Sequence, residues 1–336
     1  MRSRIILTLA AMLCVLPQAD PARTAQAKSA AYTAWGQSKH SIDGVTVPFE
    51  YFKQHIYVPV SVLGKPGFVF MLDSGASKNV LNLRTVRQLG INPTSMEPEK
   101  SVGFGYERIY VAPEEELDVE LGGLPAAHKM SVVDLNKFEM HFSHPTDGML
   151  GYPFFLHYVV KLDFQTRLGS IYSADHYVYR GLGMKIPLAP GKGSIVMPVT
   201  LGSERHKPHP VHVIVDTGSN VTLLLYENFL RALQLENGLR QSIPDRAFGL
   251  NGYYRIQRGT VDSLQIGDVE THNPTVDYLE KEEDLSPNRT VPGAIGNGVL
   301  HGFRTVIFDV PHHRMIFELP AVPPAPTVVL KETMAP

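Results

Sequence analysis

The sequence predicts an all-β protein built from two homologous lobes. Two observations predict this class: five sequence blocks recur in one order at a nearly constant offset, and both copies are rich in short apolar runs bounded by Gly, Pro and Asn. The chain of 336 residues also contains 28 glycines and 26 prolines, which favours turns over long helices. We therefore expect lobe one at residues 45–178 and lobe two at residues 185–320, related by a pseudo-twofold axis.

The repeat begins with residues 71–77 (MLDSGAS), which match residues 214–220 (IVDTGSN). The offset between matching blocks then grows by only three residues along the chain, which is difficult to reach by chance. The four further pairs are GFG at 103–105 with AFG at 247–249, VELG at 119–122 with LQIG at 264–267, DGMLG at 147–151 with PGAIG at 292–296, and VKLDF at 160–164 with VIFDV at 306–310. Their constant order predicts a duplicated domain.

Short apolar runs predict the β-strands of both lobes. Four of these runs lie at residues 56–63, 68–72, 211–215 and 305–310. Apolar spacing of three to four residues, which is typical of helices, returns only at 84–89 and 226–235. Residues 321–336 are rich in proline and show no periodicity, so we expect a flexible tail there.

The N-terminus has the pattern of a secretory signal peptide. Two arginines precede an apolar run at residues 5–16, and the small-residue sequence AQA follows at 25–27. The run is shorter than the roughly 20 residues that a membrane-spanning helix needs, which favours a cleaved signal at residues 1–27 over a retained anchor. Cleavage there would remove Cys14, the only cysteine. An exported chain without thiols is expected in a bacterial periplasm or outside the cell, with no membrane attachment after signal removal.

Charge and composition exclude two broad classes of protein. The chain has 31 Lys and Arg against 33 Asp and Glu, a net charge of −2, so it has no basic surplus for nucleic acid. Apolar residues make up 43% of the chain and charged residues 19%, which is typical of a folded core rather than a disordered protein.

Two short turns carry a carboxylate directly after an apolar strand. Asp73 and Asp216 each follow such a strand, although burying an unpaired carboxylate costs several kcal/mol. Gly75 and Gly218 stand two residues later and permit a tight turn that lifts each Asp out of the strand end. A single copy of this pattern would be an ordinary β-turn, but two copies at matching places in a repeat indicate a function.

If the lobes pack about a twofold axis, the two turns meet and their carboxyl groups lie side by side. Two like charges so close cannot both ionise, so one carboxyl keeps its proton while the other is an anion. Such a pair can activate a water molecule and stabilise the oxyanion that forms when the water attacks an amide carbonyl. The alternative is a binding or structural relic of the same fold.

With both turns and the apolar-apolar-Gly elements at 149–151 and 294–296, the chain resembles aspartic proteases of the pepsin and retropepsin type. The resemblance implies that each lobe is an acid protease barrel and that Asp73 and Asp216 are the catalytic dyad. It also implies that Ser74 and Thr217 support the dyad by bridging the lobes through their hydroxyls. The expected activity is that of an endopeptidase on peptides or proteins, without a cofactor.

The chain departs from pepsin in ways that predict further properties. Its lobes are near retropepsin size, and its DGMLG and PGAIG elements are closer to bacterial retropepsin-like proteins. Both turns lie in one chain, so we expect a monomer. Ala76 follows the first turn where Ser219 follows the second. A Ser219 hydroxyl that donates to the outer oxygen of Asp216 would make Asp216 the more acidic partner and Asp73 the proton holder.

The resemblance also implies a β-hairpin flap over the cleft. In lobe one the flap is expected at residues 101–111, with Gly103 and Gly105 at its bend and Tyr106 as a substrate contact. An aromatic residue beside glycines is also typical of a packed turn. Lobe two repeats the pattern at residues 248–254, so either segment or both could close over substrate.

Histidines give no clear metal signature. His206, His209 and His212 recur every third residue, a spacing that does not place three side chains on one face of an extended chain. No HExxH sequence occurs, so neither a metal nor another cofactor is expected. The alternative function is a catalytically silent protein that binds a peptide or partner, and a further one is an enzyme restricted to a narrow target. The presence of two mutually repelling acids favours the enzyme.

Overall fold

The computed structural model describes most of the chain between residues 39 and 320. The described residues are 39–41, 44–93, 97–99, 104–105, 107, 109–202, 208–226, 229–230, 240–279 and 291–320. The predicted signal peptide, the predicted tail, Tyr106 and most of the predicted helix at 226–235 lie outside these ranges. No helix within them is long and apolar enough to cross a membrane.

Lobe one is a closed barrel of six strands, in which each strand pairs with the next and β4 also pairs with β8. In spatial order the strands are β4 (His55–Val62), β5 (Lys65–Leu72), β10 (Gly148–Leu150), β6 (Val80–Asn82), β9 (Leu124–Val133) and β8 (Ile109–Leu121). The outer strands β3 (Glu50–Phe52) and β7 (Glu97–Glu99) extend this sheet, and the helices of the lobe are α2 (Leu83–Gln88), α3 (Asn136–Phe142) and α4 (Tyr152–His157).

Lobe two is a sheet of nine strands. In spatial order they are β17 (Arg240–Gly249), β18 (Gly252–Thr260), β21 (Thr275–Leu279), β16 (Leu223–Tyr226), β22 (Gly293–Gly296), β15 (His209–Asp216), β14 (Val196–Gly202), β19 (Ser263–Ile266) and β20 (Val269–His272). The short helix α6 (Asn297–Leu300) follows β22.

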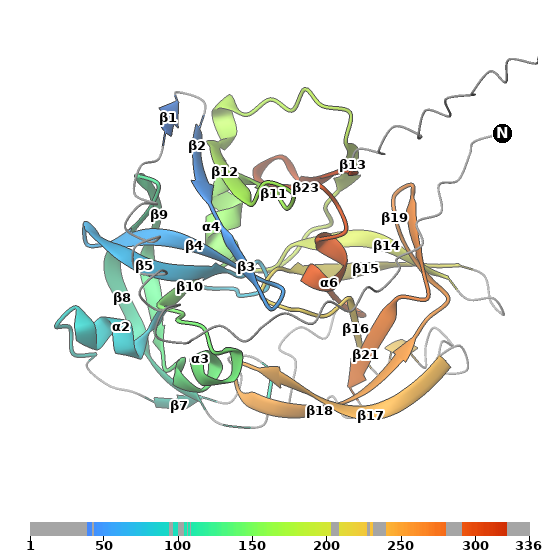
Figure 1. Ribbon diagram of the computed structural model, residues 1–336, viewed down its shortest axis with the longest axis horizontal. Coiled ribbons are helices and arrows are strands. Elements are labelled where there is room, and N and C mark those ends of the chain that lie inside the picture. Colours follow the sequence, from blue (N-terminus) through green and yellow to red (C-terminus); the bar gives the residue numbers. More distant parts are fainter. Residues whose placement is uncertain are drawn as a thin grey trace, which may run out of the picture.

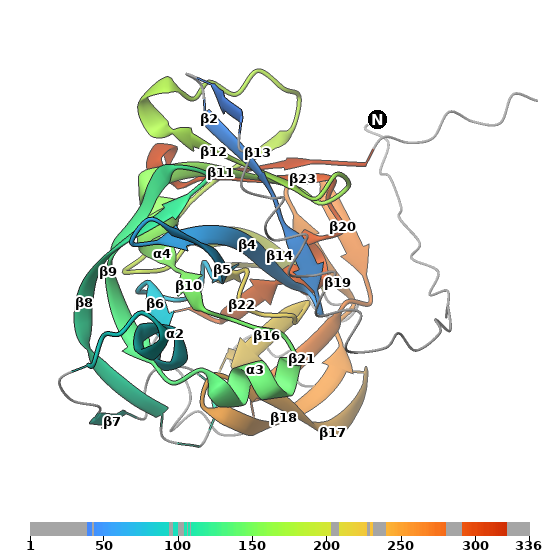
Figure 2. The same cartoon turned by 60° about the vertical axis from the view of Figure 1, so that its left-hand side comes forward.

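A third sheet joins the lobes, and it lies across the top of Figure 1, above lobe one on the left and lobe two on the right. Its order is β1 (Lys39–Ser41), β2 (Gly44–Pro48), β12 (Leu168–Ser173), β11 (Tyr158–Asp163), β23 (Thr305–Asp309), β24 (Arg314–Glu318) and β13 (Met184–Pro187), with 3-10 turns at Ala174–His176 and Val310–His312. The turned view in Figure 2 shows the same sheet spanning both lobes. Because both lobes contribute strands to it, the lobe limits at 178 and 185 remain predictions.

The strand pairing places the pseudo-twofold axis. The central strands β11 and β23 are the repeat-matched blocks, and they pair antiparallel with Lys161 opposite Ile307. These two residues are equivalent positions of the repeat, so the axis passes between them. The predicted all-β class, the two lobes and the four predicted strand runs are confirmed.

The strand that precedes the first Asp is buried on both faces. Residues 68, 70 and 72 pack into the barrel core, whereas Val69 and Met71 pack against a second cluster that contains Phe138 and Phe142 of α3. All five residues are less than a tenth exposed, because one face of β5 packs into the interior of the barrel and the other packs against α3. This double burial explains the uninterrupted apolar run and holds the end of β5 in a fixed place.

Candidate active site

The two Asp residues stand at the ends of equivalent strands. Asp73 directly follows β5, and Asp216 is the last residue of β15. Beside β5 lies the parallel strand β10, and the Asp73 amide donates to the carbonyl of Leu150 at 2.9 Å. In lobe two, β22 lies parallel to β15 with Gly296 opposite Asp216. Both apolar-apolar-Gly elements therefore pack against the turns, as predicted.

The two turns meet between the lobes. A Cβ atom added to Gly75 would lie 2.5 Å from the carboxyl carbon of Asp216, and one added to Gly218 would overlap the carboxyl of Asp73. Each glycine is thus required because the opposite carboxyl occupies the space of a side chain. The two carboxyl groups are hydrogen-bonded to each other, and both Asp residues are half-buried.

Ser74 and Thr217 lock the turns together through four reciprocal hydrogen bonds. The Ser74 amide donates to Thr217 Oγ1 at 2.9 Å, and the Thr217 amide donates to Ser74 Oγ at 3.0 Å. Each hydroxyl also donates across the lobes, Ser74 to the carbonyl of Val215 at 2.7 Å and Thr217 to that of Leu72 at 2.8 Å. Neither residue is exposed to solvent, so these bonds form in a low-dielectric environment where losing one is costly.

The dyad is asymmetric in its hydrogen bonds. Asp73 Oδ1 accepts from Gly75 N at 3.1 Å and from Ala76 N at 2.9 Å, whereas Asp216 Oδ1 accepts from Gly218 N of its own turn at 2.9 Å. Burial raises the pKa of both carboxyls. The pKa of Asp216 is raised further by the negative charge of Asp73, although the Gly218 and Gly75 amides lower it in part. The geometry therefore favours Asp73 as the anion and Asp216 as the proton holder.

This order reverses the one expected from Ser219. The Ser219 hydroxyl accepts from Val221 N at 3.5 Å, and the described contacts include no hydrogen bond from it to Asp216. Ala76 instead stabilises the first carboxylate through its backbone amide. The expectation rested on side-chain type, whereas the difference between the two turns lies in how their backbone amides point.

His55, which the sequence did not single out, lies against the second turn. His55 is 2% exposed, its imidazole packs edge-on against Phe142 with the ring centres 4.5 Å apart, and it lies beside the backbone of Gly218. Burial lowers the pKa of His55 to about 4, with smaller contributions from His144 and His141. Because protonating this buried ring costs free energy, the stability of the fold should depend on pH through His55.

His55 should make the protein less stable in acid. The unfolded imidazole binds a proton near pH 6.5 and the folded one only near pH 4, so stability that is complete above pH 6.5 is lost as the pH falls towards 4. The shift corresponds to about 3 kcal/mol. We expect the unfolding free energy of the wild type, measured in urea from pH 7 to 4, to fall by about this amount relative to His55→Phe. A constant difference between the two proteins would contradict the assignment.

Asn297 is a second residue that sequence reasoning missed. It is fully buried, and its Nδ2 lies 2.6 Å from the carbonyl of Thr217 and 2.7 Å from that of Gln54 in lobe one. The signal was available in the repeat, because the equivalent position after the first apolar-apolar-Gly element is Tyr152. A buried amide at the position that a partly buried tyrosine occupies in the other copy indicates a lobe-specific role.

The predicted flap of lobe one is a hairpin formed by β7 and β8, with Glu99 opposite Ile109. Its tip touches the tip of the hairpin formed by β17 and β18 in lobe two. The Asn251 amide donates to the Phe104 carbonyl at 2.9 Å, and the Glu107 amide donates to the Asn251 carbonyl at 2.8 Å. Both segments expected to close over substrate therefore contact each other, on the side of the molecule away from the joining sheet (Figure 1). The substrate contact predicted for Tyr106 lies outside the described residues.

Each hairpin places an aromatic side chain on the opposite lobe. Phe104 packs against the lobe-two cluster that contains Tyr254, and Phe248 packs against the lobe-one cluster. Phe248 also stacks on His141 of α3, with the ring centres 3.9 Å apart and the planes 7° apart. Phe104 and Phe248 are equivalent positions of the repeat, so these two contacts between the lobes are related by the pseudo-twofold axis. Figure 1 shows α3 beside the end of this lobe-two hairpin.

Adding a methyl group at Gly105 should separate the two tips. Gly105 has φ +130°, and a Cβ atom there would overlap the carbonyl of Asn251. Losing both cross-tip hydrogen bonds, each worth about 1 kcal/mol, should speed amide hydrogen exchange at Asn251 roughly thirtyfold in Gly105→Ala. Gly64→Ala is the matched control, because Gly64 also has a positive φ but no atom lies within 4 Å of the added carbon. Unchanged exchange at Asn251 would show that the tips do not depend on this contact.

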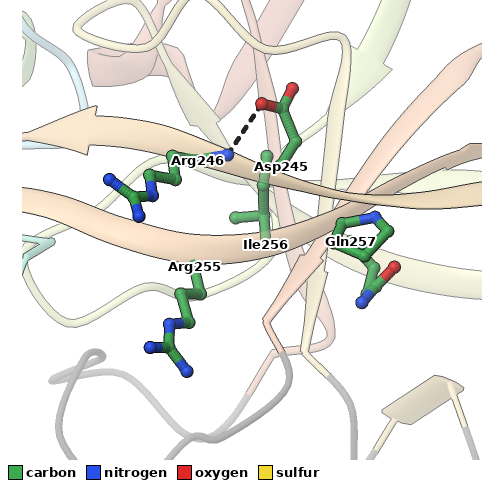
Figure 3. A pocket seen from close by; sticks show the side chains of 6 residues that line it. Asp245, Arg246, Arg255, Ile256 and Gln257 are labelled. Atoms are coloured by element: carbon green, nitrogen blue, oxygen red, sulfur yellow. Dashed lines mark hydrogen bonds between the residues drawn. The ribbon is translucent and has the colours of Figure 1, made fainter.

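A small cavity lies on the lobe-two hairpin itself (Figure 3). It measures about 200 Å³ and is lined by Pro244, Asp245, Arg246, Arg255, Ile256 and Gln257. Arg246 and Arg255 are cross-strand partners on β17 and β18, and their side chains extend to the same side of the hairpin. Neither Asp of the dyad lines this cavity, so it is distinct from the site between the lobes.

Within the ranges that the structure describes, no three His, Cys, Asp or Glu side chains are grouped so that they could hold a metal ion. His206 lies outside those ranges, whereas His209 begins β15 and His212 is exposed on it.

Comparison with protein-family models agrees with this geometry. The model described as aspartyl protease matches residues 58–154 and 197–300, one segment in each lobe. Each segment contains one Asp turn and its apolar-apolar-Gly element. A comparison with curated proteins gave no match. Because the two matched segments together cover more than half of the chain, the protein belongs to the aspartyl protease family.

Proposed function

We propose that the protein is an aspartic endopeptidase in which Asp73 and Asp216, one from each lobe, activate a water molecule to hydrolyse a peptide bond. The observation that carries the proposal is the reciprocal packing of Gly75 and Gly218 against the opposite carboxyls, which holds the two acids in hydrogen-bonding contact. A binding protein has little reason to keep two repelling acids in such contact.

The asymmetry of the pair supports a division of labour. The Asp73 carboxylate accepts a proton from the water as the water oxygen attacks the amide carbon. The Asp216 carboxyl, which keeps its proton, donates a hydrogen bond to the carbonyl oxygen as negative charge develops there. Asp73 then transfers the proton that it took from the water to the amide nitrogen, and the C–N bond breaks to give a carboxylic acid and an amine, which leaves one proton on the pair as at the start. The reaction needs one proton on the pair, so activity should decline at both pH extremes.

The two hairpins support a substrate of extended form. Their tips are joined by backbone hydrogen bonds, so a peptide reaches the dyad when the hairpins separate and is enclosed when they meet again. We further propose that the protein acts as a monomer, because both turns come from one chain. The N-terminal pattern supports export to a periplasm or the medium after cleavage near residue 27.

The test is cleavage of a diverse peptide mixture by the chain from residue 28 onward, from pH 3 to 7. A statine-type analogue, whose hydroxyl occupies the position of the attacking water, should block cleavage, whereas inhibitors of serine, cysteine and metal-dependent proteases should not. The cut sites would give the side-chain preference. A folded protein that binds the analogue but cuts no peptide or protein would instead support the silent binding protein.

The raised pKa of Asp216 also predicts how stability depends on pH. A carboxyl whose folded pKa exceeds its unfolded value stabilises the fold in acid, and this contribution is lost as the pH rises through the folded pKa. Asp216→Asn removes the titration while keeping the shape. The unfolding free energy of the wild type, minus that of the variant, should therefore fall between pH 4 and 7 in urea titrations. Parallel pH curves would show that Asp216 does not hold the proton.

A further inference from the structure

Asn297 joins the second Asp turn to lobe one. It is the first residue of α6, and its Nδ2 lies within hydrogen-bond distance of the carbonyls of Thr217 and Gln54. Both partners are acceptors, so this side-chain atom must be the amide nitrogen, which can donate to each of them. Gln54 belongs to the tight turn between β3 and β4, where Lys53 and Gln54 both adopt a positive φ. One buried side chain thus fixes a lobe-one turn against a lobe-two turn.

The peptide unit between Thr217 and Gly218 transmits this contact to the dyad. A trans peptide is planar, and its C=O and N–H point in opposite directions. The C=O accepts from Asn297 at 2.6 Å, and the N–H donates to Asp216 Oδ1 at 2.9 Å. A hydrogen bond at one end of the unit fixes its plane and strengthens the bond at the other end. Asn297 is therefore one peptide group away from the carboxyl.

Among the described residues of lobe one, no side chain is recorded in an equivalent contact with the Asp73 turn. The backbones match, since Tyr152 N donates to Ala76 O at 2.7 Å and Asn297 N donates to Ser219 O at 2.8 Å. The side chains differ, because Tyr152 packs against the hydrophobic core instead of reaching the Asp73 turn. In line with this difference, the bond from Gly75 N to Asp73 is 3.1 Å, longer than its counterpart in lobe two. The Asn297 contact thus favours the charged form of Asp216, whereas the Ala76 amide favours the charged form of Asp73.

We propose that Asn297 is a positioning residue for Asp216, which holds the Thr217–Gly218 peptide so that its N–H points at the carboxyl and ties this geometry to lobe one through Gln54. The inference rests on the proposed function, because that function gives Asp216 its place in the dyad. Without the Asn297 amide, the buried Thr217 carbonyl and the part-buried Gln54 carbonyl lose this donor, and the peptide unit can rotate. The Gly218 bond to the carboxyl then lengthens, and Asp216 keeps its proton to a higher pH.

The test compares Asn297→Leu, which has a similar volume but no donor, with Tyr152→Leu at the equivalent position of lobe one. The first readout is the Gly218 amide resonance in ¹⁵N-labelled protein, which requires no catalysis. We expect its proton signal to move upfield in Asn297→Leu, and its titration with pH to shift towards higher pH. Both should match the wild type in Tyr152→Leu. In peptide hydrolysis by Asn297→Leu, kcat should fall roughly tenfold while KM stays within about twofold of the wild type. The pH at which activity is lost on the basic side should rise.

The outcomes separate the two proposals. A loss of stability in Asn297→Leu with an unchanged Gly218 signal and titration would mean that Asn297 only stabilises the contact between the lobes, which overturns the inference. If the leucine variant does not fold, Asn297→Ser provides a shorter donor and should give a smaller shift in the same direction; no shift again overturns it. A wild type that hydrolyses no peptide while its Gly218 signal responds to Asn297 would overturn the proposed function and leave the positioning role supported.

Discussion

Peptide hydrolysis should fall by on the order of 10³-fold or more when either Asp73 or Asp216 is replaced by Asn. Asp73→Asn removes the base that accepts the proton of the attacking water. Asp216→Asn removes the carboxylic acid that hydrogen-bonds to the developing oxyanion. Because the two groups act on one water in one step, the double variant should be little worse than either single variant. The measurement is kcat/KM for a peptide identified in the cleavage mixture.

Asp163→Asn is the matched control for this pair. Asp163 ends β11 and caps a turn by accepting from the amides of Gln165 and Thr166, which an Asn oxygen can also do. It lies in the sheet that joins the lobes, away from the two Asp turns, so its variant should retain full activity. Circular dichroism and thermal unfolding would verify that all three variants are folded. Substantial hydrolysis by a folded Asp73→Asn or Asp216→Asn would exclude the dyad as the source of activity.

Breaking the hydroxyl network between the turns should cost about 2–5 kcal/mol of unfolding free energy. Ser74→Ala deprives the Val215 carbonyl of its donor and the Thr217 amide of its acceptor, both in a fully buried place. Thr217→Val does the same to the Leu72 carbonyl and the Ser74 amide. Since either change loosens the same junction, the double variant should lose less stability than the sum of the two single losses.

Urea unfolding of the four proteins at one pH gives the double-mutant cycle. The control is Ser170→Ala, which removes an exposed hydroxyl pair with Thr46 in the joining sheet, where the Oγ atoms are 3.0 Å apart. Water replaces the lost partner there, so the change should stay within about 0.5 kcal/mol. Losses below about 1 kcal/mol for Ser74→Ala would show that the network does not hold the lobes together.

Local sequence features predicted most of the fold and the positions of the two acids. The apolar runs, such as that ending before Asp73, predicted strands because burial and side-chain period are local properties of a segment. The repeat of the Asp-Ser/Thr-Gly turn predicted that the two turns lie next to each other, because a repeat implies a twofold axis and equivalent turns can meet on that axis. The hydroxyl bridges of Ser74 and Thr217, implied by the family resemblance, also appear in the structure.

The limits of the sequence are clearest at the second turn. Ser219 predicted that Asp216 is the stronger acid, but acidity depends on burial, on the neighbouring charge and on the direction of amide groups that the sequence does not specify. The contact of His141 with Phe248 joins residues from different lobes, so no local pattern could indicate it.

By itself, then, the sequence determined a duplicated β protein with two carboxylates at equivalent strand ends, because strand periodicity, turn glycines and a repeat are written in neighbouring residues. The tertiary structure alone decided which backbone amides reach each carboxyl, which helix contacts the lobe-two hairpin, and that the Asn297 side chain bonds to the second Asp turn. These properties arise from distances and directions between segments far apart in the chain, and electrostatic and hydrogen-bond energies change steeply with both.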